Sequence, residues 1–439
     1  MWLSQNKIAR KKMLEDIGVK SLDELFKVIP EDTQSKAYQS VEKLGKPLEQ
    51  FKVESIFNQF LSENQDLNSV FVGAGAYKWW IPPVIDEILR RSEFFTAYTP
   101  YQPEVSQGTL QVIYDFQSAV CYLTGMDVAN ASMYDGATAL AEAVKMVGEA
   151  KRVRKVYYPK NLHPYYKEVL LTYFSFWDYE FEEVDFDRES GCTKWKDLPE
   201  EKSIWIVSYP NFLGILESMR EIDELATSKQ ASLIVLANPH VLVYKKKLGD
   251  YRNVEVVVGE GQPFGIPLWA GGPYLGFFAA RKAYMRKMPG RIVGKTVDRN
   301  GKTAYVLTLQ AREQHIKRAR ATSNICSNEA LCALAFTTYI LWWGKRLQKH
   351  VLEVSKRAHE VAELLEEYGY KRIYNGEFFN EFVIDAPIDV LEEGMKKGYV
   401  FGVPLSYWGY GDGILITITD AATHADIAAL LDNFGVEKF

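Results

Sequence analysis

The sequence has little of several features, and each shortage excludes a class of protein. Among 439 residues there are four cysteines, Cys121, Cys192, Cys326 and Cys332, and no two of them form a CxxC pair. Zinc ribbons and disulfide frameworks need closely spaced or numerous cysteines, so neither is expected. An excess of positive charge is also lacking, because 52 basic and 57 acidic residues give a net charge of −5. This balance argues against a nucleic-acid or anionic-membrane surface.

Long apolar runs are missing as well. The most apolar stretch, residues 330–343, is shorter than the roughly 20 residues that a membrane-spanning helix requires. It is typical of a helix buried inside the protein. The first residues, MWLSQNKIARKKMLEDIG, are basic but have no apolar core of a secretory signal. We therefore expect a soluble, cytoplasmic protein with reduced thiols and with neither nucleic acid nor membrane as a partner.

What is present is an alternation of short apolar runs and helical patterns. The helical patterns include residues 103–125 and residues 135–152, the second of which opens with Asp135 and Gly136. The apolar runs are typical of buried strands and lie at residues 156–158, 204–210, 232–239, 254–258 and 274–280. Such alternation predicts an α/β fold whose mostly parallel sheet carries helices on both faces.

The two ends of the chain differ from this middle part. Residues 1–65 are predicted to form an N-terminal helical arm, and residues 66–330 a large α/β domain. After a helical stretch expected over residues 311–343, a long helix at 347–369 and the strand ILITIT (414–419) follow. Residues 331–439 are therefore predicted to form a small C-terminal α+β domain.

Several catalytic motifs are nearly matched and fail on spacing. GEGQPFG (259–265) is one residue too long for the dinucleotide fingerprint, and a strand is expected after it where that fingerprint needs a helix. GRIVGKT (290–296) is one residue short of a Walker A loop. The sequence has no HExxH and no GxSxG motif. No metal site is expected, and an NAD-dependent dehydrogenase is disfavoured.

The segment FFTAYTPYQPEVSQG (94–108) concentrates aromatic, proline and polar residues just before a helix. One interpretation is a rigid turn that anchors the helix. The other is a wall that faces a ligand or a partner, since tyrosine supplies contact area at low entropic cost. Composition alone does not choose between the two.

Longer stretches of the sequence resemble one family. FVGAGAYKWWIPPVIDEILRRSEFFTAYTPYQPEVSQGTLQ (71–111), LTGMDVANASMYDGATALAEA (123–143), GEGQPFGIPLWAGGPYLGFFAA (259–280) and ATSNICSNEAL (321–331) are similar to the P-protein of the glycine cleavage system, the decarboxylating glycine dehydrogenase. The resemblance implies a pyridoxal-phosphate transferase fold of the aspartate-aminotransferase type (fold type I), with a large, mostly parallel-sheet domain and a small C-terminal α+β domain.

The motifs resemble those of the N-terminal half of that family, which in some organisms is a separate subunit, subunit 1. A pyridoxal-phosphate enzyme needs a lysine to hold the cofactor and an acid at the pyridine nitrogen. Aligned with the family's lysine segment, FGIPLWAGGP puts Gln262 at the lysine position, and an amide cannot form an imine. Asn238 aligns with the position of the pyridine acid. The resemblance therefore implies a subunit that bears no cofactor lysine.

The same resemblance implies roles for other residues and molecules. Gly136, Ala137 and Thr138, at a helix start, would form a vestigial pocket for an anion or cofactor. Pyridoxal 5′-phosphate would be held by the catalytic partner, subunit 2, in an assembly with two copies of each subunit. Glycine would be decarboxylated and its aminomethyl group passed to the lipoyl arm of H-protein. The wall of the partner's active site or tunnel would include Thr96, Tyr98, Thr99, Tyr101 and Gln102.

Two alternatives stay open at this stage. The chain could be an autonomous pyridoxal-phosphate enzyme that uses another lysine, such as Lys245 or Lys295. It could also be a non-catalytic scaffold or regulatory subunit that keeps only the fold.

Overall fold

The computed structural model describes residues 6–64, 67–326 and 329–436. The remaining residues of the predicted arm and domains, namely 1–5, 65–66, 327–328 and 437–439, lie outside the described residues. The chain divides into two compact units, residues 1–66 and residues 67–439. The domain boundaries inferred from the sequence stay predictions.

The first unit is helical. Its α-helices are α1 (Lys7–Ile17), α2 (Glu31–Glu42) and α3 (Gln50–Ser62), and none of them has a buried residue. Large apolar side chains on α3 are therefore exposed, among them Phe57 and Phe60, whose rings contact each other edge to face at 6.3 Å. The helical pattern read from this part of the sequence is confirmed.

The second unit is built on a seven-stranded sheet of order β2-β8-β7-β6-β5-β3-β4. Its strands are β2 (Val128–Ala129), β3 (Lys155–Pro159), β4 (Glu180–Val184), β5 (Ser203–Tyr209), β6 (Ala231–Ala237), β7 (Val254–Glu260) and β8 (Gly276–Ala280). All pairings from β4 to β7 are parallel, and β8 is antiparallel to both of its neighbours. Every residue of β5 and β6 is buried, as expected for central parallel strands. The predicted mostly parallel sheet is confirmed.

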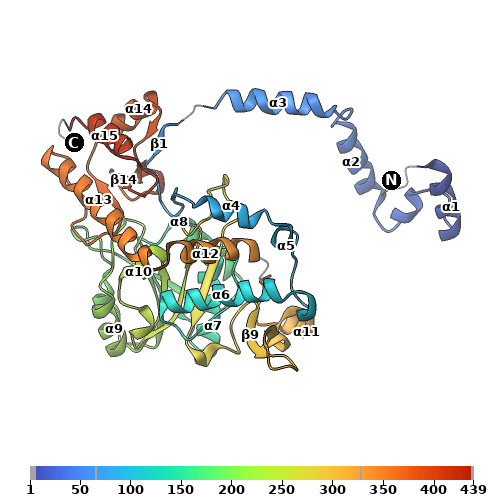
Figure 1. Cartoon of the computed structure of the whole chain (residues 1–439), viewed down its shortest axis with the longest axis horizontal. Helices are drawn as coiled ribbons and strands as arrows, with labels where there is room; N and C mark the ends of the chain where they lie inside the picture. Colours follow the sequence, from blue (N-terminus) through green and yellow to red (C-terminus); the bar gives the residue numbers. More distant parts are fainter. Residues whose placement is uncertain (1–5, 65–66, 327–328, 437–439) are drawn as a thin grey trace. The chain divides into compact units, whose positions relative to one another are not determined.

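Helices cover both faces of this sheet (Figure 1). Trp205 and Leu233 point to the face covered by α6 (Gln107–Thr124), α9 (Met219–Ser228), α10 (Pro239–Tyr244) and α12 (Ala330–Trp343). Ile204 and Ile234, their neighbours along the strands, point to the opposite face and pack with α7 (Gly136–Lys151) and α8 (Pro164–Tyr173). The alternation of side chains along each strand thus builds two cores from one sheet.

Local signals fix the end of α6 and the start of α7. Gly125 ends α6 in the left-handed conformation, with φ 74°. Asp135 begins α7 with a capping box, because its side chain accepts from Thr138 N while the Thr138 hydroxyl accepts from Asp135 N. Both boundaries agree with the helical patterns in the sequence.

The C-terminal part of the second unit has its own core. A three-stranded antiparallel sheet, β11 (Glu381–Ile384), β14 (Ile414–Thr417) and β13 (Val403–Pro404), packs with α13 (Leu347–Glu367), α14 (Asp389–Lys396) and α15 (His424–Asn433). The early strand β1 (Ser69–Val70) pairs in parallel with β12 (Tyr399–Val400), and Phe71 is buried in the same core. The chain therefore enters the second unit alongside its C-terminal part (Figure 1).

Between residues 290 and 326, the rejection of a Walker A loop agrees with the structure, whereas the expected helix over 311–343 does not form as one element. GRIVGKT forms strand β9 (Ile292–Val297), which pairs antiparallel with β10 (Thr303–Thr308), so a helix cannot follow it as a Walker A loop requires. The helical stretch expected over 311–343 is interrupted between α11 (Gln314–Lys317) and α12. In this interval the Ser323 hydroxyl accepts a hydrogen bond from Ile325 N at 3.1 Å. Such local bonds compete with helix formation.

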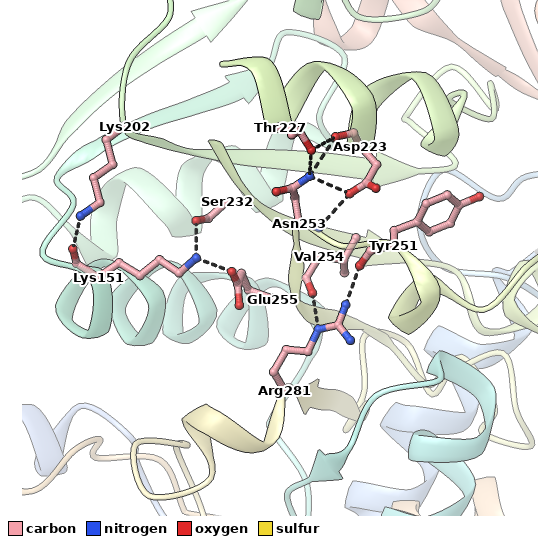
Figure 2. A network of polar contacts seen from close by, with 10 residues as sticks. All are labelled: Lys151, Lys202, Asp223, Thr227, Ser232, Tyr251, Asn253, Val254, Glu255 and Arg281. Atoms are coloured by element: carbon pink, nitrogen blue, oxygen red, sulfur yellow. Dashed lines mark hydrogen bonds and ion pairs between the residues drawn. The ribbon is translucent and has the colours of Figure 1, made fainter. Parts of the chain in front are cut away.

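A polar network closes the amino-terminal edge of the large sheet (Figure 2). Lys151, at the end of α7, donates to Ser232 Oγ at 2.9 Å and forms an ion pair with Glu255. Asn253 Nδ2 donates to Asp223 Oδ1 at 3.0 Å, which ties α9 to the start of β7. The network consists of Lys151, Lys202, Asp223, Thr227, Ser232, Tyr251, Asn253, Val254, Glu255 and Arg281. Because this edge is occupied by structural contacts, ligands are expected at the opposite, carboxyl edge.

Candidate functional site

A cavity of about 70 Å³ lies at the carboxyl ends of β5, β6 and β7. This is the position where open α/β sheets bind their ligands. Its lining includes Gly75, Tyr77, His163, Tyr166, Ser208, Asn211, Phe212, Asn238, Glu260 and Glu381. None of the described residues that line it is a lysine.

Gln262 lies between Glu260 and Pro263 in the sequence, and both of these residues line the cavity. The side chain of Gln262 itself does not line the cavity and is held by backbone groups. The residue is 1% exposed, and its Oε1 accepts from Tyr77 N at 3.0 Å. Its Nε2 donates to Tyr77 O at 2.9 Å and to Ile266 O at 2.7 Å. The amide thus satisfies three backbone groups in a buried setting, where an unpaired group is costly. Gln262 holds two segments together and leaves no free group for a ligand.

Asn238 stands at the end of β6 and lines the cavity. Its Oδ1 accepts from His240 N at 2.9 Å, so the side chain caps α10. A neutral amide used as a helix cap does not supply the negative charge that a protonated pyridine nitrogen needs.

Carboxylates of the chain itself fill the start of α7. Gly136 N donates to Glu260 Oε2 at 3.0 Å, and Thr138 N donates to Asp135 Oδ1 at 2.7 Å. Glu260 Oε1 also accepts from Gln262 N at 2.9 Å and from Leu275 N at 3.1 Å. A helix N-terminus favours an anion, and here Glu260 and Asp135 supply it. The N–H groups of Gly136 and Thr138 are therefore already used.

The two buried acids at the cavity wall have raised pKa values. Burial raises the pKa of Glu260 to about 8, against three backbone N–H donors that lower it. Burial also raises the pKa of Glu381, whose oxygens accept from Ala74 N at 2.8 Å and from the Tyr77 hydroxyl at 2.9 Å. A carboxyl group at this place occupies space and, when ionised, repels a phosphate ester.

These residues do not fit pyridoxal phosphate. Gln262, at the position that the family resemblance gives to the lysine, is a fixed amide, and Asn238, at the position that it gives to the acid, is a helix cap. The N–H groups at the start of α7 are engaged by Glu260 and Asp135. Lys245, proposed above as a substitute, forms an ion pair with Glu377, and Lys295 is exposed on β9. Neither of these lysines lines the cavity.

Sequence reasoning missed several residues of this cavity. His163 caps α8, and its Nε2 lies 2.7 Å from Ala74 O, while burial lowers the pKa of its ring. Tyr166 packs against the His163 ring with centroids 5.0 Å apart. His163 directly precedes Pro164, a pair of residues typical of a helix start, and this was the available signal.

The segment with Thr96, Tyr98, Thr99, Tyr101 and Gln102 lies away from this cavity, and none of these residues lines it. Thr99 is half-buried, whereas Tyr98 is 72% exposed and Tyr101 47% exposed. The Tyr101 hydroxyl accepts from Arg291 Nη2 at 2.8 Å and lines a second cavity near the hairpin. The structure thus separates the two groups of residues that the sequence singled out.

The described residues include no group of three or more His, Cys, Asp or Glu side chains that could hold a metal ion. No helix in the described ranges is both long enough and apolar enough to cross a membrane.

Comparisons with known proteins agree on one family. The family model for the glycine cleavage system P-protein matches residues 1–434. A protein of Desulfitobacterium hafniense called probable glycine dehydrogenase (decarboxylating) subunit 1 is 45% identical over 441 residues, which cover 98% of each chain. A crystal structure of glycine decarboxylase (P-protein) of the glycine cleavage system, in inhibitor-bound form, is 34% identical, covers 99% of both chains and has a TM-score of 0.85. A structure of SPT with its PLP internal aldimine has a TM-score of 0.55 at 12% identity over 80% of this chain and 82% of its own, which concerns the fold alone.

Proposed function

This chain belongs to the glycine cleavage system P-protein family, as subunit 1 of the two-subunit form, and we propose that it is the subunit without the cofactor-bearing lysine. It has the fold type I architecture of pyridoxal-phosphate enzymes and is a subunit of a decarboxylating glycine dehydrogenase. The proposal concerns the division of work between this chain and its partner.

One observation carries the proposal. Gln262, at the position that the family resemblance gives to the lysine, is held by Tyr77 and Ile266 through three hydrogen bonds of 2.7–3.0 Å. A side chain in that arrangement neither reacts with an aldehyde nor moves aside at low cost. The cap formed by Asn238 and the engagement of Gly136 by Glu260 support the same conclusion.

The partner subunit therefore holds pyridoxal phosphate, which stabilises negative charge on the glycine α-carbon as carbon dioxide leaves. The lipoyl arm of H-protein then receives the aminomethyl group. The name of the related protein, subunit 1, supports the existence of a partner subunit. An assembly with two copies of each subunit would suit a fold whose active sites commonly lie between chains.

This chain contributes a contact surface that positions groups at the partner's active site, and it takes no part in covalent chemistry. Tyr98 and Tyr101 are exposed aromatic groups on a proline-rich turn, and Gln102 is exposed beside them. Rigid tyrosines of this kind are typical of contact surfaces. We assign Thr96, Tyr98, Thr99, Tyr101 and Gln102 to the wall of the partner's active site or tunnel.

The test compares the two purified chains, separately and mixed, in the exchange of carbon between glycine and bicarbonate in the presence of H-protein. We expect activity only in the mixture. Full activity of the partner alone would make this chain a scaffold or regulatory subunit.

Trapping with borohydride tests the location of the cofactor independently of activity. After incubation with pyridoxal phosphate and reduction, the partner is expected to carry a stoichiometric lysyl adduct and this chain none. A stoichiometric adduct at Lys245, Lys295 or any other lysine here would make the chain an autonomous enzyme and contradict the proposal.

A further inference from the structure

A second cavity, of about 150 Å³, lies beside the β9–β10 hairpin. Its wall includes Tyr101, Arg291, Arg312, Glu313 and His315. A water molecule needs about 10–15 Å³ of such space, so this cavity has room for a small molecule. The proposed function gives no role to its charged groups.

Arg312 is the main feature of the cavity. The residue is 9% exposed, and its Nη1 donates to Met288 O. Its Nε and Nη2 have no hydrogen-bond partner among the residues that the structure describes. Burial lowers the pKa of the guanidinium while the nearby Glu313 raises it. A guanidinium stays charged in proteins, so two unsatisfied donors on a buried cation are complementary to an oxyanion.

Glu313 supplies an opposite charge beside it. Its Oε2 forms an ion pair with Arg291 Nε at 3.3 Å and lies 3.8 Å from His315 Nδ1. Its Oε1 has no hydrogen-bond partner within the described ranges, although the side chain is only 9% exposed. Two neighbouring residues that line the cavity thus carry unpaired atoms of opposite hydrogen-bonding type, an acceptor on the Glu313 carboxylate and donors on the Arg312 guanidinium.

We propose that this cavity binds a small zwitterionic α-amino acid, with the carboxylate on Arg312 and the ammonium group on Glu313. The two ends of the ligand match the two unsatisfied side chains in charge and in hydrogen-bonding type. A simple anion would satisfy Arg312 but would face the Glu313 carboxylate, which repels it. A simple amine would satisfy Glu313 and leave the buried guanidinium unpaired.

The volume selects small ligands, and glycine is the smallest α-amino acid. The inference rests on this cavity alone and does not depend on which subunit holds the cofactor. The cavity is related to the proposed function through Tyr101. This residue lines the cavity, and we assign it to the wall that faces the partner. Glycine bound here would be held on the surface that we assign to the partner's active site or tunnel.

The experiment uses the full chain without its partner and measures binding of glycine by isothermal titration calorimetry. Acetate, methylammonium and trimethylglycine are the comparison ligands, since the first two each lack one charge and the third has no N–H donor. We expect glycine to bind about tenfold or more tightly than each of them, because each loses at least one charged hydrogen bond.

Three variants locate the binding. Arg312→Gln and Glu313→Gln are each expected to weaken glycine binding about tenfold or more. Arg299→Gln, at an exposed position of the neighbouring hairpin, is the matched control and is expected to bind normally. Thermal unfolding checks that each variant is folded, and if one is not, the ligand series with the unchanged chain decides.

Equal binding of acetate and glycine would reduce the cavity to an anion site and overturn the inference. Absence of glycine binding at millimolar concentration, or unchanged binding by Arg312→Gln, would overturn it as well. None of these measurements involves decarboxylation, so the inference and the proposed function stand or fall separately.

Discussion

The side-chain amide of Gln262 pairs with both backbone groups of Tyr77, accepting from its N at 3.0 Å and donating to its O at 2.9 Å. The pairing resembles one rung of a β-ladder, with a side chain in place of one strand. It joins the segment that follows β1 to the loop that follows β7, two parts of the chain that are 185 positions apart. Gln262, at a position that the family resemblance associates with the cofactor lysine, thus has a structural role in this chain.

Removal of this amide should destabilise the chain. Gln262→Met keeps most of the volume but leaves Tyr77 N, Tyr77 O and Ile266 O without their partner. We expect the free energy of unfolding to fall by about 1–3 kcal/mol, measured by urea denaturation. Gln348→Met, at an exposed position of α13, is the control and should change stability little. An equal effect of both substitutions would show that the amide has no such role.

Introduction of a lysine at this position should not create a cofactor site. In Gln262→Lys, the position that the family resemblance gives to the pyridine acid still carries the neutral Asn238, and Glu260 still accepts from Gly136 N. Incubation with pyridoxal phosphate should therefore give no absorbance band characteristic of a bound imine and no stoichiometric adduct at residue 262 after reduction. A stable adduct there would mean that Gln262 alone separates this chain from a cofactor-binding subunit.

The buried acids predict the direction of a pH effect on stability. Burial raises the folded-state pKa of Glu260 to about 8 and that of Glu217 to about 7, above the unfolded value of about 4.3. Between these values the folded state binds more protons, so the free energy of unfolding should fall as the pH rises from about 5 to 8. Glu260→Gln should reduce this slope in urea denaturation series, whereas Glu87→Gln, at an exposed position, should not. A slope unchanged by Glu260→Gln would contradict the assignment.

Tyr98 should matter to the assembled enzyme and not to the isolated chain. Its side chain is 72% exposed, so Tyr98→Ala should change the stability of the isolated chain by no more than about 0.5 kcal/mol. If the side chain lies against the partner, the substitution should weaken association or the exchange reaction by more than about 1 kcal/mol. Tyr407→Ala, with 74% exposure in the C-terminal region, is the matched control. Normal exchange and normal association of Tyr98→Ala would exclude Tyr98 from the wall.

Gly214 should not tolerate a side chain. Its φ is 82°, and an added Cβ would lie 2.0 Å from Glu381 O, where the loop after β5 meets β11. Gly301 has a similar φ of 77° with no atom within 4 Å of an added Cβ, so Gly301→Ala measures the backbone strain alone, about 1 kcal/mol. Gly214→Ala should cost about 1–3 kcal/mol more in thermal or urea unfolding. Equal losses of stability for Gly214→Ala and Gly301→Ala would mean that the loop after β5 moves away from Glu381 at little cost.

Much of the fold could be predicted because its signals are local. β5 and β6 are continuous apolar runs buried on both faces, and Asp135 and Gly125 are ordinary helix-end residues. The β9–β10 hairpin was missed because polar residues such as Lys295 interrupt its apolar ones and leave no clear alternation. The pairing of Ser69 with Tyr399 joins distant positions, which no local pattern indicates.

The candidate site was only partly predictable for a similar reason. Gln262 and Asn238 were singled out through the family resemblance, which supplies the expected residue types. The hydrogen bonds of Gln262 to Tyr77 and of Gly136 to Glu260 connect distant segments and needed three-dimensional geometry. The unsatisfied atoms of Arg312 and Glu313 are likewise a property of packing, since the two residues are unremarkable in sequence.

Strand β4, at one edge of the large sheet, affects how two copies of the isolated chain can contact each other. β4 forms an edge of the sheet, and three of its five residues, Glu180, Glu182 and Glu183, are exposed acids. An unprotected edge strand is a template for another strand and hence for aggregation, and charged side chains oppose this addition. Two copies approaching edge to edge would have to bury these acids and the side chains of Lys155 and Lys167 that pair with them. Charged side chains along β4 therefore oppose the pairing of this edge with the same edge of a second copy.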